Sequence, residues 1–156
     1  MSQTQGHTHY RRHHVPCRAG SRLGCAEVIL LDTHIWVRWI EPDTDPLPVA
    51  ISRMIDSSDQ VTVSAVSCWE VAYLAKRNRI ILPLPMDEWL QAALDESGVT
   101  SLPLTAKMAA RAASLADIHR DPADRFIIAT AIETGATLLT LDSVFKNYPE
   151  LIGLLL

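Results

Sequence analysis

The sequence predicts an α/β fold, a three-layer α/β/α sandwich with a central parallel sheet. The first observation is Val28–Leu31 (Val-Ile-Leu-Leu), an unbroken apolar run typical of a strand that is buried on both faces. The second is the alternation of strand-like and helix-like segments along the rest of the chain. This alternation favours parallel strands whose connecting helices cover both faces of the sheet.

The first half of the predicted domain contains two strands and three helices. After the strand 28–31, Asp32 ends the apolar run and a short helix follows at 33–39. Three prolines between 41 and 48 indicate a loop, and a helix at 49–55 precedes a second strand at 60–63. The next helix, 64–78, has apolar residues at helical spacing, namely Val66, Trp69, Tyr73 and Leu74.

The second half continues the alternation. Pro83 and Pro85 break the chain before an amphipathic helix at 86–96, which Gly98 ends, and a weak strand at 99–104. An alanine-rich helix at 105–118 and a helix at Pro122–Thr134 come next, and Gly135 ends the second of them. The pattern predicts a strand at 137–141, followed by Asp142, and a short last strand at 151–152.

The chain divides into a basic leader and an acidic domain. Residues 1–26 hold four arginines, four of the six histidines and no acid, which leaves 10 basic and 18 acidic residues for the remainder. We expect residues 1–27 to be an unstructured leader, because they have no hydrophobic period, and residues 28–156 to form one folded domain. A start codon assigned too far upstream would produce such a leader, and its histidines and Cys17 lack the spacing of a zinc finger.

Composition restricts the classes of protein to which the chain can belong. No run of about 18 apolar residues occurs, so no membrane span is predicted. Three cysteines (Cys17, Cys25 and Cys68) are too few and too scattered for a disulfide framework, and a reducing cytoplasm is the expected location. An acidic domain has no electrostatic attraction for nucleic acid unless a metal ion supplies one.

Acidic residues follow two of the predicted strands. Asp32 and Asp142 come directly after 28–31 and 137–141, and the carboxyl ends of parallel strands are where sites form in α/β sheets. Aspartate also favours turns and helix N-caps, so each position has a purely structural explanation. Two buried strands that both end in aspartate favour the functional interpretation.

Two further acids are expected at the same edge, near the starts of helices. Glu70 completes a possible capping box with Ser67, and Asp124 occupies the third position of a helix that Asp121 would cap. Each of these acids therefore also has a structural alternative. Their combination with Asp32 and Asp142 is harder to explain by capping alone.

Clustered carboxylates require a cation. Two charges about 4 Å apart repel by about 4 kcal/mol at an effective dielectric of about 20. Oxygen ligands suit Mg²⁺ or Mn²⁺ rather than zinc, and such an ion polarises a phosphodiester and activates water for in-line attack. The predicted catalytic and metal-binding residues are therefore Asp32, Glu70, Asp124 and Asp142.

Competing chemistries have less support. The chain has no glycine-rich phosphate loop and no nucleophile elbow around its serines, and His34 stands where an aspartyl phosphatase needs a second aspartate. Cys68 is expected to be a core residue. His119 and Arg120 precede the acids and could contact a substrate phosphate, although a solvated loop histidine is the simpler expectation.

Three blocks of residues together form a specific pattern. The first is Ile-Leu-Leu-Asp-Thr-His-Ile-Trp at 29–36, and the second is Val-Ser-Ala-Val-Ser-Cys-Trp-Glu-Val-Ala at 63–72, followed by Lys76. The third is His-Arg-Asp-Pro-Ala-Asp-Arg-Phe-Ile-Ile-Ala at 119–129, closed by Leu-Thr-Leu-Asp at 139–142 and Phe145. In their order and combination, which are more specific than any one block alone, the three blocks resemble the PIN domain, in the branch of VapC-type toxins of toxin–antitoxin pairs.

This resemblance implies a PIN-like fold and a Mg²⁺- or Mn²⁺-dependent ribonuclease that acts as a toxin. It implies that Asp32, Glu70, Asp124 and Asp142 are the four acids in order, with supporting roles for Asp121, Thr140 and Arg125. It also implies an RNA substrate, a cognate antitoxin that covers the site, and a homodimer. Trp36, Trp39 and Ile40 are candidates for a partner surface, although core burial is the simpler expectation.

Two alternatives remain from the sequence. One is a non-catalytic PIN scaffold that binds RNA or protein, which a metal-dependent cleavage assay would distinguish. The other is a phosphate-binding domain of receiver type, for which Lys146, four residues beyond Asp142, is a poor match to the required lysine.

A chain that starts at Val28 should keep the fold and activity of the full chain. The leader offers no periodic apolar residues to bury, so its removal should leave the melting temperature unchanged. Thermal melts of the two chains check this expectation. A large drop in melting temperature on deleting residues 1–26 would show that the leader packs on the domain.

Overall fold

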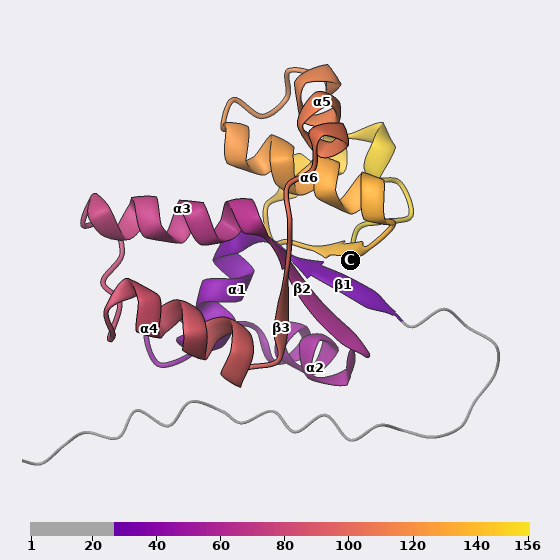
Figure 1. Ribbon diagram of the computed structural model, residues 1–156. Helices are drawn as coiled ribbons and strands as arrows, with labels where there is room; N and C mark the ends of the chain where they lie inside the picture. The colour runs from indigo at the N-terminus through magenta and orange to yellow at the C-terminus, as the bar shows by residue number, and fades with distance from the viewer. Residues whose placement is uncertain (1–26) are drawn as a thin grey trace, which may run out of the picture.

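A parallel four-stranded sheet forms the centre of the computed structural model, which describes residues 27–156 (Figure 1). The strands, in chain order, are β1 (Val28–Leu31), β2 (Gln60–Ser64), β3 (Val99–Leu102) and β4 (Thr137–Leu139). They lie in the order β3-β2-β1-β4, and every neighbouring pair is parallel. The predicted leader lies outside the described residues except for Glu27.

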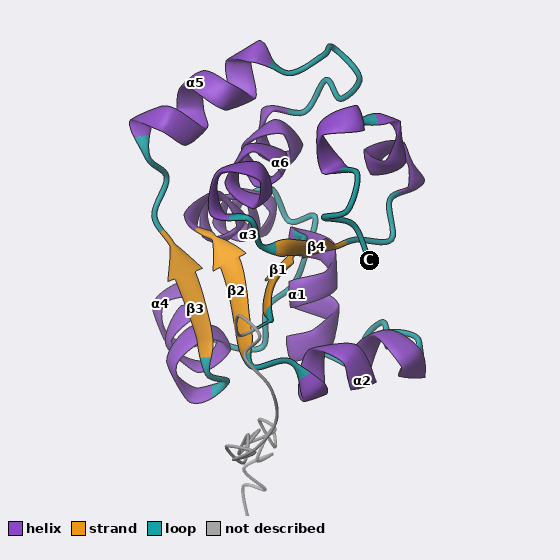
Figure 2. Cartoon of the chain, turned by 90° about the vertical axis from the view of Figure 1, so that its right-hand side faces the viewer, coloured by secondary structure: helices purple, strands orange, loops and turns teal. Residues whose placement is uncertain are grey.

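Six α-helices connect the strands and cover the sheet (Figures 1 and 2). They are α1 (Thr33–Ile40), α2 (Val49–Ser57), α3 (Ala65–Lys76), α4 (Met86–Gln91), α5 (Ala106–Ser114) and α6 (Pro122–Thr134). A π-helical segment, Ala92–Glu96, continues α4. Two 3₁₀ segments, η2 (Ser143–Asn147) and η3 (Pro149–Leu151), follow β4. No helix within residues 27–156 is long and apolar enough to cross a membrane.

The side chains of β1 alternate between two hydrophobic cores. Ile29 and Leu31 pack in the core beneath α1 and α4, whereas Leu30 packs on the other face with Ile127 and Ile128 of α6. Successive residues of a strand point to opposite faces, so an unbroken apolar run is what a doubly covered strand needs. The predicted three-layer α/β/α sandwich is confirmed.

Several predicted elements end earlier in the structure and one predicted strand is absent, and hydrogen bonds explain the first of these differences. The predicted helix 105–118 stops at Ser114 because the guanidinium of Arg125 takes the carbonyls of Leu115 and Ala116 as acceptors. The strand predicted at 137–141 stops at Leu139. The predicted last strand, 151–152, is wrong: Leu151 ends a 3₁₀ segment, and only a single bridge, Leu138 to Leu155, pairs the C-terminal segment with β4.

The apolar pattern of α3 was a poor guide to its buried face. Trp69 is 56% exposed and Tyr73 41% exposed, while Ser67 is fully buried and accepts a hydrogen bond from Thr33 Oγ1 (2.9 Å). The helix is positioned by its packing against α1 and α6, and this arrangement leaves the aromatic stripe facing solvent. Conversely, Trp36 and Trp39 are buried, which confirms the core expectation over the partner-surface alternative.

Candidate metal centre

The carboxyl ends of β1 and β4 bring Asp32 and Thr140 together. Asp32 follows β1, is 4% exposed, and its side chain makes no capping hydrogen bond to α1. Its Oδ2 instead accepts a hydrogen bond from Thr140 Oγ1 (2.8 Å), while Oδ1 is buried without a partner among the described residues. Burial raises the pKa of this carboxyl, against the opposing effect of the Thr140 hydroxyl. The capping explanation for Asp32 is therefore wrong.

Thr140 also connects the first acid to the last. Its Oγ1 accepts a hydrogen bond from the main-chain N–H of Asp142 (3.1 Å) while it donates to Asp32. A single hydroxyl thus fixes the spacing between two acids that lie far apart in sequence. The supporting role that the resemblance implies for Thr140 stays a prediction, and these two hydrogen bonds are the contacts through which it would act.

Glu70 points from α3 toward the same edge. The capping-box interpretation is wrong, because Ser64, not Ser67, is the N-cap of α3 and accepts a hydrogen bond from the Val66 N–H (3.3 Å). Glu70 Oε2 is buried and has no hydrogen-bond partner in the described part of the chain. Burial is the main cause that raises the pKa of Glu70, and the charges of Asp121 and Asp32 add to it.

The beginning of α6 contributes two acids with different roles. Asp121 is the N-cap, as expected, and its Oδ1 accepts from the Ala123 N–H (2.9 Å). Asp124 lies in the first turn, and burial, followed by the negative charge of Asp32, raises its pKa to about 6. The charges of Asp121 and Glu70 act in the same direction. These interactions show that acids from three separate segments converge at one edge of the sheet.

Asp142 occupies a different environment from the other acids. Its Oδ1 accepts a hydrogen bond from the Val144 N–H (2.8 Å), which is the largest cause of its lowered pKa. Its Oδ2 lies 3.3 Å from Nε2 of His119. Asp142 therefore stays ionised at the rim while burial favours protonation of Asp32, Glu70 and Asp124.

Three further residues that the sequence singled out are Arg125, His34 and Cys68. Arg125 donates hydrogen bonds to the carbonyls of Ala112 (3.1 Å), Leu115 (2.7 Å) and Ala116 (2.9 Å). It therefore fixes the segment before α6 and does not reach a carboxylate of the site. His34 is exposed beside the acids, and its charge opposes the raised pKa values of Asp32 and Glu70. Cys68 packs against the core, as expected.

His119 is the residue that sequence reasoning missed. The simpler expectation, a solvated loop histidine, is wrong, because His119 is 9% exposed and contacts Asp142. The two residues are 23 positions apart and lie in different segments, so no local pattern connects them.

The residues at this edge fit a hard divalent cation. All four acids supply oxygen, and two buried carboxylate oxygens, Asp32 Oδ1 and Glu70 Oε2, have no partner within residues 27–156. Within residues 27–156 no three His, Cys, Asp or Glu side chains lie close enough together to hold a metal ion by themselves. Mg²⁺ does not require such a cluster, since it keeps several waters and binds through one or two carboxylates.

Comparison with known proteins assigns the chain to a family. Residues 29–151 match the PIN domain family, so the chain belongs to it. Ribonuclease VapC22 of Mycobacterium tuberculosis is 37% identical over 121 residues, which cover 77% of this chain and 91% of that protein.

Solved structures support the same fold. VapBC2 from Rickettsia felis, bound to a DNA fragment from its promoter, aligns with a TM-score of 0.60 at 22% identity and covers 83% of this chain and 97% of that one. A toxin–antitoxin complex from Klebsiella pneumoniae aligns with a TM-score of 0.58 at 18% identity, covering 82% and 95%. At these identities the two likenesses concern the fold.

Proposed function

We propose that this protein is a Mg²⁺- or Mn²⁺-dependent endoribonuclease and the toxin of a toxin–antitoxin pair. The single observation that carries the proposal is the pair of buried, unpartnered carboxylate oxygens on Asp32 and Glu70. Unpaired buried carboxylates destabilise a fold, so they are expected where a cation completes the site. The 37% identical relative is a ribonuclease, which favours RNA as the substrate.

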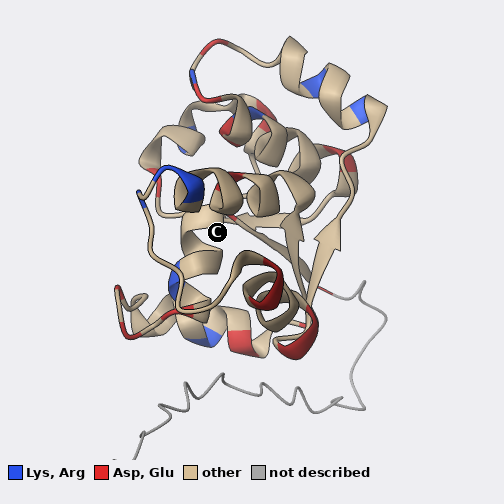
Figure 3. Cartoon of the chain, turned by 60° about the vertical axis from the view of Figure 1, so that its left-hand side comes forward, with Lys and Arg blue, Asp and Glu red and all other residues tan. Residues whose placement is uncertain are grey.

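The acids and their neighbours would have different roles in such a site. Asp32, Glu70, Asp124 and Asp142 would hold the ion, Thr140 orients Asp32, and Asp121 caps the helix that carries Asp124. When bound, a divalent ion supplies charge stabilisation at the phosphate and activation of water. The ion would also offset part of the net negative charge of the domain, whose acidic and basic residues are spread over its helices and loops (Figure 3).

The test is cleavage of RNA by the purified protein and by Asp32→Asn. Asparagine keeps the size of the side chain and removes a charge that the ion needs, so we expect cleavage to fall by at least about 100-fold. Sequencing the ends of the fragments identifies the cut site. Equal cleavage by the two proteins would contradict the proposal. RNA binding without cleavage by the wild type would favour the non-catalytic scaffold instead.

The proposed toxin function also implies a protein partner and a location in the cell. The structural neighbour from Klebsiella pneumoniae is a toxin–antitoxin complex, and we infer a small antitoxin that covers the carboxylate edge. We place the protein in the cytoplasm, where the RNA and a newly made antitoxin would be available.

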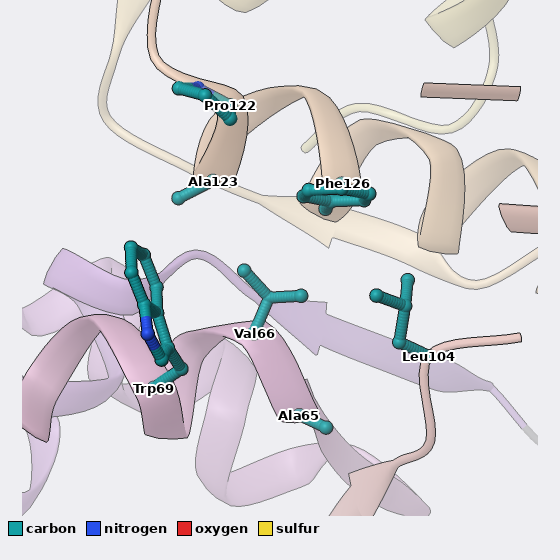
Figure 4. Close-up of a pocket in the computed structure, with 7 residues that line it drawn as sticks. All are labelled: Ala65, Val66, Trp69, Leu104, Pro122, Ala123 and Phe126. Carbon is teal, nitrogen blue, oxygen red and sulfur yellow. The ribbon is translucent and has the colours of Figure 1, made fainter. Parts of the chain in front are cut away.

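We also infer a homodimer that is formed through an exposed apolar groove. The groove, about 340 Å³ in volume, lies between α3, α6 and the segment before α5 (Figure 4). Its lining residues are Ala65, Val66, Trp69, Leu104, Pro122, Ala123 and Phe126. Trp69, at the edge of the groove, stacks on Tyr73, which does not line it (ring centroids 5.2 Å apart). An uncharged lining fits a second copy better than an antitoxin that recognises an acidic edge, because homodimer interfaces are the more apolar class.

Tyr73→Glu should convert the dimer to a monomer. A charge placed beside the aromatic groove would have to be desolvated twice in a symmetric interface. Light scattering after size-exclusion chromatography measures the mass. Ile152→Glu is the matched control, since Ile152 is exposed but does not line the groove. A Tyr73→Glu protein that remains dimeric, or a wild type that is monomeric, would contradict the interface.

A further inference from the structure

His119 is held rigidly in the segment between α5 and α6. Tyr148 stacks on its ring (centroids 5.5 Å apart, planes at 8°), and Phe145 meets the ring edge-on at 4.6 Å. The main-chain N–H of His119 donates to Tyr148 Oη (2.9 Å). These contacts fix the plane of the imidazole and direct Nε2 toward Asp142.

The hydrogen-bond roles of the two ring nitrogens follow from their neighbours. Nε2 lies 3.3 Å from Asp142 Oδ2, and an ionised carboxylate only accepts hydrogen bonds, so Nε2 carries the proton and donates it. Nδ1 is buried without a partner among the described residues. A polar ring with an unsatisfied nitrogen is a poor choice for packing alone, because phenylalanine would fill the same aromatic stack without that penalty.

The carboxylate of Asp142 is thereby held at both oxygens. Oδ1 accepts from the Val144 N–H (2.8 Å) and Oδ2 accepts from His119. The side chain is 44% exposed, so without the histidine only the Val144 N–H would hold the carboxylate, and Oδ2 would have no partner among the described residues. The segment that carries His119 also leads directly into α6, which carries Asp124. His119 therefore connects Asp142 to the segment that positions Asp124.

We propose that His119 is a positioning residue that orients the carboxylate of Asp142 for the divalent ion. The inference rests on the proposed function, since it assigns a role within the same site. Hydrogen-bond partners of metal ligands set the direction of the ligand, and their loss typically weakens metal affinity about 10–100-fold. His119 touches neither the substrate nor the ion in this role. It acts through Asp142.

His119→Phe is the most direct test, because it keeps the aromatic stack and removes the Nε2 donor. The melting temperature of the metal-free variant should equal or exceed that of the wild type, since the unpartnered Nδ1 is also removed. The Mg²⁺ or Mn²⁺ dissociation constant, obtained from melting temperature against ion concentration, should rise about 10–100-fold. Cleavage should recover at high ion concentration, because the ligand itself is still present.

His119→Gln and His119→Asn form a matched pair that does not depend on the behaviour of phenylalanine. Both lose the aromatic ring, but the glutamine amide reaches the position of Nε2 and the asparagine amide does not. We expect His119→Gln to bind the ion at least about 10-fold more tightly than His119→Asn. Equal affinities in this pair, or a His119→Phe affinity within about threefold of the wild type, would overturn the role of His119. A wild type that shows no ion-dependent stabilisation would instead contradict the metal centre itself.

Discussion

Asp124→Asn should make the metal-free protein more stable at neutral pH and abolish its response to Mg²⁺. The pKa of Asp124 is raised from 3.8 to about 6 by burial and by the charge of Asp32. Above pH 6 the folded protein therefore carries an ionised carboxylate that is less favourable there than in the unfolded chain. Asparagine removes that charge. The expected gain is about 1 kcal/mol, discounted because the side chain is partly exposed to solvent.

The capping interpretation of Asp124 predicts the opposite sign. A carboxylate in the first turn of α6 would stabilise the helix through its dipole, and its neutralisation would cost about 0.3–1 kcal/mol. Paired thermal melts with and without Mg²⁺, at fixed ionic strength, separate the two. Thr105→Ala is the control, because it removes the N-cap of α5, which carries none of the four acids, and should cost about 1 kcal/mol with or without metal. A less stable Asp124→Asn protein that keeps the full Mg²⁺ shift and still cuts RNA would contradict the site.

The pH dependence of the free energy of unfolding, compared between the wild type and Asp124→Asn, gives a second test of the same assignment. Because the folded pKa of Asp124 is raised, its contribution to stability is complete below pH 3.8 and is lost as the pH rises through about 6. The stability difference between Asp124→Asn and the wild type should therefore grow from pH 4 to pH 7 in the absence of metal. Mg²⁺ affinity of the wild type should fall as the pH drops below about 6, since the ion must displace a proton.

Removal of divalent ions should abolish RNA cleavage and lower the melting temperature. The acids that meet at the edge are all oxygen ligands, and two of their oxygens have no other partner among the described residues. An ion at 100 times its dissociation constant stabilises the native state by about 2.7 kcal/mol through mass action. The measurements are cleavage and melts after treatment with excess chelator, followed by addition of Mg²⁺ or Mn²⁺. Undiminished cleavage in excess chelator would contradict a metal mechanism.

Local sequence patterns predicted the ends of a helix well where residues with a strong capping preference stand at those ends. Asp121, Pro122 and Gly135 set both ends of α6, and the structure has Asp121 as the N-cap and Gly135 at a left-handed φ of 70°. The run 28–31 predicted a doubly covered strand because its apolar residues must reach two cores. The placement of Asp32 at the end of β1 followed from the same reasoning, whereas Asp142 lies beyond the end of β4 and is the N-cap of η2.

Long-range contacts account for what the sequence did not reveal. The buried face of α3 depends on its packing against α1 and α6, so the aromatic residues Trp69 and Tyr73, which a periodic pattern assigns to the core, lie at the surface. The hydrogen bond from His119 to Asp142 joins two segments whose distance is set only by the packing of α6 and the 3₁₀ segments on the sheet.

The central claim is that this carboxylate edge binds one catalytic divalent ion, and Mn²⁺ binding measures it most directly. Electron paramagnetic resonance follows free Mn²⁺ during titration of chelator-treated protein in the absence of RNA. We predict saturable binding by the wild type that Mg²⁺ displaces and that Asp32→Asn loses. Absence of saturable binding, or binding that Asp32→Asn leaves unchanged, would contradict the claim.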